Sequence, residues 1–146
     1  MKLWKSIFIM IFISFVLQYY LMSLIMTNEY DNITNSAGKI YISFIMALLM
    51  GLTEVGMYDY MTAKFSWKYY ISLTTILFIF IIMYKKQIGI NDKEYLKEMI
   101  EHHSMAILTS DEIIDKTHNY KVKQLAYKIK NTQENEIEYM KKLIKS

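Results

Sequence analysis

Residues 6–26 read SIFIMIFISFVLQYYLMSLIM, and no charged residue interrupts them. A helix of about 20 apolar residues is long enough to cross the hydrocarbon core of a bilayer. A cleaved signal peptide has a shorter apolar region and a small-residue cleavage site, whereas this stretch ends in SLIMT at residues 23–27. We therefore expect a retained transmembrane helix.

Two more apolar stretches follow a polar loop at residues 28–38. The second predicted span runs from about Ile40 to Tyr58 and the third from about Tyr69 to Tyr84. Tyr and Trp stand near the ends of the spans, as is typical of residues at the lipid headgroups. Three spans put the two ends of the chain on opposite sides of the bilayer, and the lysines beside the spans favour a cytoplasmic N-terminus with the C-terminal part outside the cytoplasm.

The composition favours an all-α protein and excludes several kinds of site. Proline and cysteine are absent from the 146 residues, and only four glycines occur. Little therefore interrupts helices, and disulfides, thiolate metal sites and cysteine nucleophiles are excluded. Residues 88–146 carry ten lysines against ten acidic residues, so the net charge of +3 lies around the apolar spans. We expect the lipid bilayer as a partner and no nucleic acid.

The pattern changes after residue 87, which divides the chain into a three-helix transmembrane region (1–87) and a helical hairpin domain (88–146). Asn91 or Asp92 is expected to cap the first helix of the hairpin, and residues 115–119 are expected to break it. One face of that helix carries Tyr95, Met99, His102, Ala106, Thr109 and Ile113. The predicted inward stripe of the second helix carries Val122, Leu125, Ala126, Ile129, Gln133, Glu136, Ile137, Met140 and Ile144.

Two helices joined by a short turn form an antiparallel hairpin. A lone hairpin buries too little apolar surface to be stable by itself. We therefore expect a homodimer in which two hairpins form a four-helix bundle.

The sharpest chemical feature is the heptapeptide MIEHHSM at residues 99–105. In a helix, residues three and four apart are neighbours, so Met99 lies beside His102 and His103, and His102 lies beside Met105. Imidazole binds several transition metals, and thioether sulfur selects cuprous copper. With polar and thioether groups of the second helix added, the candidate ligands are His102, His103, Met99, Met105, Glu136 and Met140. The alternative is that His102 makes a hydrogen bond in the core, His103 is solvated and the methionines only pack.

Residues 91–144 resemble the family called domain of unknown function 305, a ferritin-like helical group. The first helix matches it at Asp92, at Tyr95 and over residues 99–107, which read MIEHHSMAI. The second matches at Leu125, Ala126, Ile129, Gln133, Glu136, Ile137 and Met140. The resemblance implies a ferritin-like half-bundle, the membrane-anchored form with three preceding helices, and copper bound outside the cytoplasm. Glu101 stands where proline is usual, and we expect it to straighten the helix before the histidines.

Other chemistries are disfavoured. A ferritin-like di-iron centre requires Glu-x-x-His on two helices, but Met99 and Ile100 stand three residues before the two histidines. Ser104 and His103 are adjacent, so their side chains diverge on a helix and do not form a nucleophile and base pair. We expect no enzyme. The remaining hypotheses are a copper-binding protein for sequestration or relay, and a non-catalytic interaction module with structural histidines.

The second span carries a stripe of methionines around one acidic residue, at Met46, Met50, Glu54, Met57 and Met61. A carboxylate inside the bilayer is costly unless it faces a polar partner. The stripe is interpreted either as a thioether-lined path for a soft cation or as a face on which helices pack.

Overall fold

The computed structural model describes residues 2–145, and every regular element in this range is a helix, which confirms the all-α class. The elements are α1 (Leu3–Val16), a π-helical turn (Leu17–Leu21), α2 (Met22–Met26), a 3₁₀ turn (Tyr30–Asn32), α3 (Ala37–Thr62), α4 (Trp67–Lys85), α5 (Asp92–Lys116) and α6 (Tyr120–Lys145). Contacts group these residues into two units, 1–22 with 38–89 and 23–37 with 90–146. The loop between the first two apolar helices thus belongs with α5 and α6.

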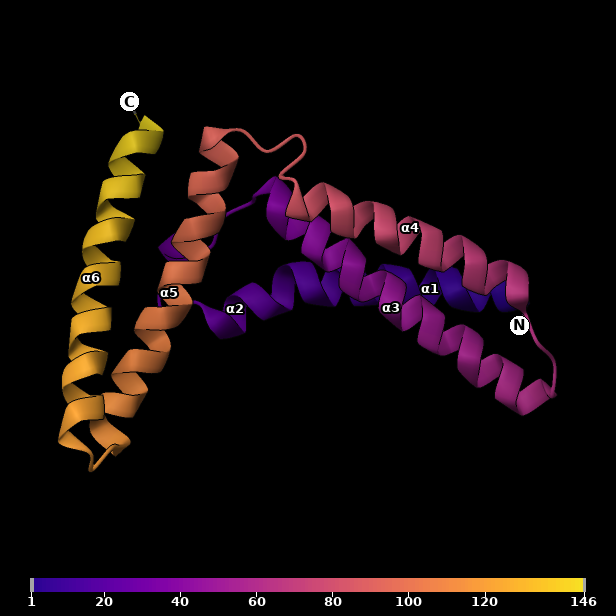
Figure 1. Cartoon of the computed structure of the whole chain (residues 1–146), viewed down its shortest axis with the longest axis horizontal. Helices are drawn as coiled ribbons and strands as arrows, with labels where there is room; N and C mark the ends of the chain where they lie inside the picture. The colour runs from indigo at the N-terminus through magenta and orange to yellow at the C-terminus, as the bar shows by residue number, and fades with distance from the viewer. Residues whose placement is uncertain (1, 146) are drawn as a thin grey trace. The chain divides into compact units, whose positions relative to one another are not determined.

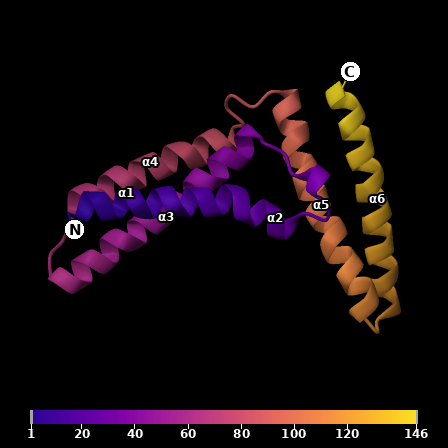
Figure 2. The same cartoon turned by 180° about the vertical axis from the view of Figure 1, so that it is seen from behind.

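The first unit consists of α1, α3 and α4, which lie side by side in Figures 1 and 2. Its buried core contains Leu3, Ile7, Leu48, Val55, Leu73 and Leu77. Gly51 of α3 lets α1 approach closely, since a Cβ atom at this position would lie 2.8 Å from Cγ1 of Ile11. A larger residue at Gly51 would therefore require the Ile11 side chain or α1 to shift.

Three helices are long and apolar enough to cross a membrane: Leu3–Met26, Ala37–Thr62 and Trp67–Lys85. They coincide with the three predicted spans and extend a few residues beyond them. The residues beyond each predicted span are helical because a helix does not end where the apolar stretch ends: polar and aromatic residues there continue its backbone hydrogen bonding.

The acidic residue of the methionine stripe has a polar partner within the first unit. Ser6 Oγ of α1 donates a hydrogen bond to Glu54 Oε1 of α3. All four methionines of the stripe are exposed on the surface of this unit, with exposed fractions from 42% at Met50 to 73% at Met61. The methionines therefore lie on an outer face, and Glu54 faces the neighbouring helix.

In the second unit, α5 and α6 run side by side in opposite directions and are joined at residues 117–119 (Figures 1 and 2). They share an apolar core of Ile100, Ile107, Ile137 and Met140, against which Leu96, Met99 and Ile144 pack. The expected cap is confirmed, since Asn91 Oδ1 accepts a hydrogen bond from the Glu94 amide at 2.9 Å and α5 begins at Asp92.

The predicted inward stripe of α6 divides in two. Ala126, Ile137 and Met140 are buried, as predicted, but Val122, Leu125 and Ile129 are exposed. The inward prediction is wrong for these three and for Glu136, which is 48% exposed, because the surface that α5 covers is narrower than the predicted stripe.

On α5, the predicted stripe is also largely exposed, because α5 turns Ile100 and Ile107 toward α6. We call the exposed side of the hairpin the open face. It comprises Tyr95, His102, Thr109 and Ile113 of α5 with Val122, Leu125 and Ile129 of α6.

Candidate metal-binding site

The segment EHHS at residues 101–104 divides its side chains between two sides of α5. Successive residues of an α-helix point about 100° apart. Glu101 and Ser104 contact the loop of residues 28–37: Glu101 Oε1 accepts a hydrogen bond from the amide of Thr34 at 2.5 Å, and Ser104 Oγ accepts one from the amide of Asn28 at 2.8 Å. His102 and His103 are directed to the open face and to α6.

His103 is positioned between the two helices. Its Nδ1 atom lies 3.1 Å from Oε2 of Glu136 on α6, and its side chain is 23% exposed. The two atoms are close, yet their orientation does not give a hydrogen bond, and Nδ1 has no hydrogen-bond partner among residues 2–145. The imidazole is thus held with its buried Nδ1 next to a carboxylate of the facing helix.

His102 points elsewhere and has its own carboxylate neighbour. Its Nε2 atom lies 3.9 Å from Oε1 of Glu98, one turn earlier on α5, and its side chain is 48% exposed, whereas Glu98 is 4% exposed. The two histidines therefore differ in surroundings. Each imidazole has a different carboxylate neighbour, which lies on α5 itself for His102 and on α6 for His103.

The candidate sulfur ligands fall into two groups. Met140 is buried among Ile100, Ile107 and Ile137, so its thioether forms part of the core. Met99 is partly buried at the edge of that core, and Met105 is partly buried on α5. Met99 and Met105 are therefore better placed than Met140 to contact an ion beside the histidines.

The described residues do not form a closed metal site. No group of three or more His, Cys, Asp or Glu side chains among the described residues could hold an ion. Imidazole, carboxylate and thioether groups are donor types that bind transition metals, and thioethers favour soft ions. A complete coordination sphere needs ligands beyond those that one hairpin brings together.

A family model described as "Domain of unknown function (DUF305)" matches residues 87–146. The chain is also 40% identical over 116 residues to "Uncharacterized protein L153" of Acanthamoeba polyphaga mimivirus, a match that covers 75% of this chain and 76% of that protein. The chain belongs to the DUF305 family. No solved structure matches it.

The match to the mimivirus relative is longer than the segment that the DUF305 model covers. The likeness therefore extends from the hairpin into the apolar part of this DUF305 protein. The match implies that the hairpin and at least part of the preceding apolar region occur together in both chains.

The loop of residues 28–37 binds α5 through four polar residues at helical spacing: Glu94, Lys97, Glu101 and Ser104. Thr34 Oγ1 donates to the carbonyl oxygen of Lys97 at 2.6 Å, and the amide of Ala37, the first residue of α3, donates to Glu94 Oε2 at 2.8 Å. The hydrogen bond from Lys97, aided by that from Ala37, holds the pKa of Glu94 below its ordinary value of 4.5. Every one of these bonds lies on the side of α5 away from the open face.

Sequence reasoning missed this docking, although one signal for it was present. Polar residues at 94, 97, 101 and 104 recur three and four apart, as expected for one helical face, but such a pattern is also that of a solvated face. The residue that departs from the family pattern, Glu101, is the acceptor for the loop. Its role here is to bind Thr34 and Ser23, whose Oγ donates to Glu101 Oε2 at 3.1 Å.

Proposed function

We propose that this DUF305 protein is a multi-pass membrane protein whose α5–α6 hairpin binds a soft transition metal, copper, for sequestration or relay without turnover. The observation that carries the proposal is the placement of His103: its imidazole is partly exposed, and its Nδ1 lies 3.1 Å from a carboxylate of the facing helix, as in sites where a carboxylate orients a histidine through the nitrogen that does not bind the metal. A carboxylate beside a histidine fixes the orientation of the ring and raises its basicity as a ligand.

Each candidate residue would have its own role in metal binding. His102 and His103 supply imidazole nitrogens, and Met99 and Met105 supply thioethers, which favour the cuprous ion. Glu136 orients His103, and Met140 supports the site from the core. Copper would be bound by these donors without a catalytic role, because α5 carries no pair of a nucleophile and a base beside them.

A second copy of the chain is the expected partner, in a ferritin-like arrangement of two half-bundles. The open face exposes Leu125 at 56% and Ile113 at 41% of their surface. His103 and Glu136 meet at the edge of this face, whereas Asp111 and Lys130, 2.6 Å apart, connect the helices on the other side. Covering the open face with the same face of a second hairpin would bury its apolar residues and bring two more histidines to the site.

The orientation that we propose has the N-terminus in the cytoplasm and the hairpin outside it. Three helices long enough to span the membrane support opposite sides for the two ends. Reporter fusions to the C-terminus test this: an alkaline phosphatase fusion should be active, and a fusion active only in the cytoplasm would contradict the orientation.

An interaction module is the second candidate, and the open face is the observation that favours it. In that case the two histidines serve structure by pairing with Glu98 and Glu136, and the exposed apolar residues bind another protein. This candidate predicts that the chain dimerises or binds its partner in the absence of any metal.

Metal content separates the two candidates. Elemental analysis of the purified full-length chain should give about one copper ion per pair of hairpins, and His102→Ala/His103→Ala should lose it. His118→Ala is the matched control, because His118 lies in the exposed break between α5 and α6. Equal copper in the double variant and the wild type would refute metal binding by the His pair.

A further inference from the structure

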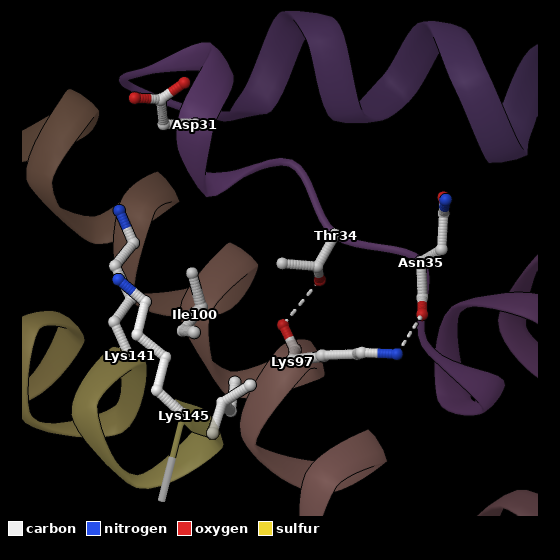
Figure 3. Close-up of a pocket in the computed structure, with 8 residues that line it drawn as sticks. Asp31, Thr34, Asn35, Lys97, Ile100, Lys141 and Lys145 are labelled. Carbon is white, nitrogen blue, oxygen red and sulfur yellow. Dashed lines mark hydrogen bonds between the residues drawn. The ribbon is translucent and has the colours of Figure 1, made fainter.

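The second unit contains a pocket of about 440 Å³ on the loop side of α5, at the end of the hairpin remote from its turn. Ile100 and Ile144 line its apolar part, and Thr34 and Asn35 of the loop line one wall (Figure 3). Three lysines, Lys97, Lys141 and Lys145, surround it together with a single acidic residue, Asp31. The pocket is thus a largely apolar, open hollow with three lysines around it.

The three lysines are not equivalent. Nζ of Lys97 lies 2.8 Å from Glu94 Oε1 and 3.4 Å from the carbonyl oxygen of Asn35, so its charge is already compensated. Lys141 and Lys145 make no ion pair with any residue in the range 2–145. Figure 3 shows both side chains extending toward the part of the pocket where Asp31 lies.

Two lysines four residues apart lie on the same face of a helix and repel each other. A bound anion would remove this repulsion, and an ammonium group binds phosphate as a point charge. The apolar floor of Ile100 and Ile144 would accept a glycerol backbone or the first methylenes of an acyl chain beside such a group. These features together match the junction between the headgroup and the tails of a phospholipid.

The connectivity of the loop strengthens this match. The wall of the pocket belongs to residues 31–35, and these lie between Met26, the last residue of one candidate span, and Ala37, the first residue of the next. A loop this short between two spans lies at the level of the headgroups, where basic residues attract anionic lipids. This step rests on the membrane location in the proposed function.

We infer that the pocket binds a phosphate-bearing anion, and that an acidic phospholipid headgroup supplies it. Lys141 and Lys145 contact the phosphate, and Ile100 and Ile144 contact the adjoining apolar part of the lipid. The site is separate from the histidines, which lie on the other side of α5.

The test uses the full-length chain in detergent and native mass spectrometry with added phosphatidylglycerol or phosphatidylcholine. Wild type should retain phosphatidylglycerol in preference to phosphatidylcholine, and Lys141→Gln/Lys145→Gln should weaken that retention about tenfold. Lys128→Gln/Lys142→Gln removes the same charge from exposed positions of α6 outside the pocket and should retain the lipid. Equal weakening in both double variants would overturn the inference, because general attraction by the positive charge of α6 would then explain lipid retention. No weakening in either double variant would also overturn it, because Lys141 and Lys145 would then only complement the helix dipole.

A second arm distinguishes a lipid from a soluble anion. Inorganic phosphate is added to the chain in neutral phosphatidylcholine nanodiscs, and thermal unfolding is followed by circular dichroism. A rise in Tm for wild type but not for the pocket variant, without retention of phosphatidylglycerol, would support the phosphate site and contradict a lipid as its source. Extraction of the chain from membranes by alkaline carbonate would refute the membrane location separately, and the phosphate arm would still test the pocket.

Discussion

The backbone amide of Thr34 donates a hydrogen bond to Glu101 Oε1 at 2.5 Å, so the residue that immediately precedes the two histidines holds the loop between the first two apolar helices. Glu101→Gln replaces a charged acceptor with a weaker neutral one. We expect it to destabilise the docked loop by about 1 kcal/mol, the difference between a hydrogen bond to a charged acceptor and one to a neutral acceptor. Hydrogen exchange at the Thr34 amide should become faster, whereas Glu138→Gln, at an exposed position of α6, should leave it unchanged.

Acidification should release the first residue of α3 from α5. The hydrogen bond from Lys97 lowers the pKa of Glu94 in the folded chain below its ordinary value of 4.5. A lowered pKa stabilises the fold fully above 4.5, and this contribution is lost as the pH falls through the lower folded pKa. Urea unfolding of wild type and Glu94→Gln should differ by the same amount at pH 7 and pH 6 and converge below 4.5. A difference that grows on acidification would contradict the assignment.

Glu136 should affect metal affinity more than stability. It is half exposed and lies 3.1 Å from Nδ1 of His103, so Glu136→Gln keeps the shape but weakens the orientation of the imidazole. We expect the affinity for cupric ion to fall about 10–100-fold, measured by competition with a chelator. Glu134→Gln, whose carboxylate lies near Lys130, provides the control and should bind copper like wild type.

Met140, in contrast to Glu136, should affect stability more than metal affinity. Its side chain is 7% exposed in the core of the hairpin, so Met140→Ala leaves a cavity and should cost about 2–5 kcal/mol of unfolding free energy. Met140→Leu preserves the volume and should cost less than about 1.5 kcal/mol. Retention of copper by the leucine variant, in the same elemental analysis, would assign Met140 to packing; a loss of copper at unchanged stability would make it a ligand.

A charge on the open face should prevent association of two hairpins. Leu125 is 56% exposed on this face, and Leu125→Glu should convert the dimer in mild detergent to a monomer, as measured by sedimentation velocity. Tyr127 is 49% exposed on another side of α6, and Tyr127→Glu should remain dimeric. A wild-type chain that is monomeric at all concentrations would remove the basis for this prediction.

The helices could be predicted because their signals are local. An uncharged run as long as residues 6–26 and a cap such as Asn91 act on the neighbouring backbone, wherever the rest of the chain lies. The core of the hairpin was less predictable. The apolar stripe on α6 is wider than the surface that α5 buries, so periodicity alone did not separate Ile137, which is buried, from Leu125, which is exposed.

The docked loop could not be predicted in this way, since its bonds join residues more than 50 positions apart. Ser104 is fully buried, and it accepts hydrogen bonds from Asn28 and Asn32 of the loop. Nothing in the residues next to Ser104 indicates such partners. The two histidines were recognised as a pair from their adjacency, but their separate neighbours, Glu98 and Glu136, depend on how α5 is rotated against α6.

The alternation of loop contacts and histidines along EHHS constrains how α5 can turn. A rotation of α5 about its own axis that brought His102 toward Glu136 would carry Glu101 and Ser104 away from Thr34 and Asn28 and break the hydrogen bonds between them. The hydrogen bonds to the loop therefore fix the rotation of α5 about its axis, and with it the directions in which both imidazoles point. Substitutions in the 28–37 segment should change the orientation of the two imidazoles without altering any residue that contacts them.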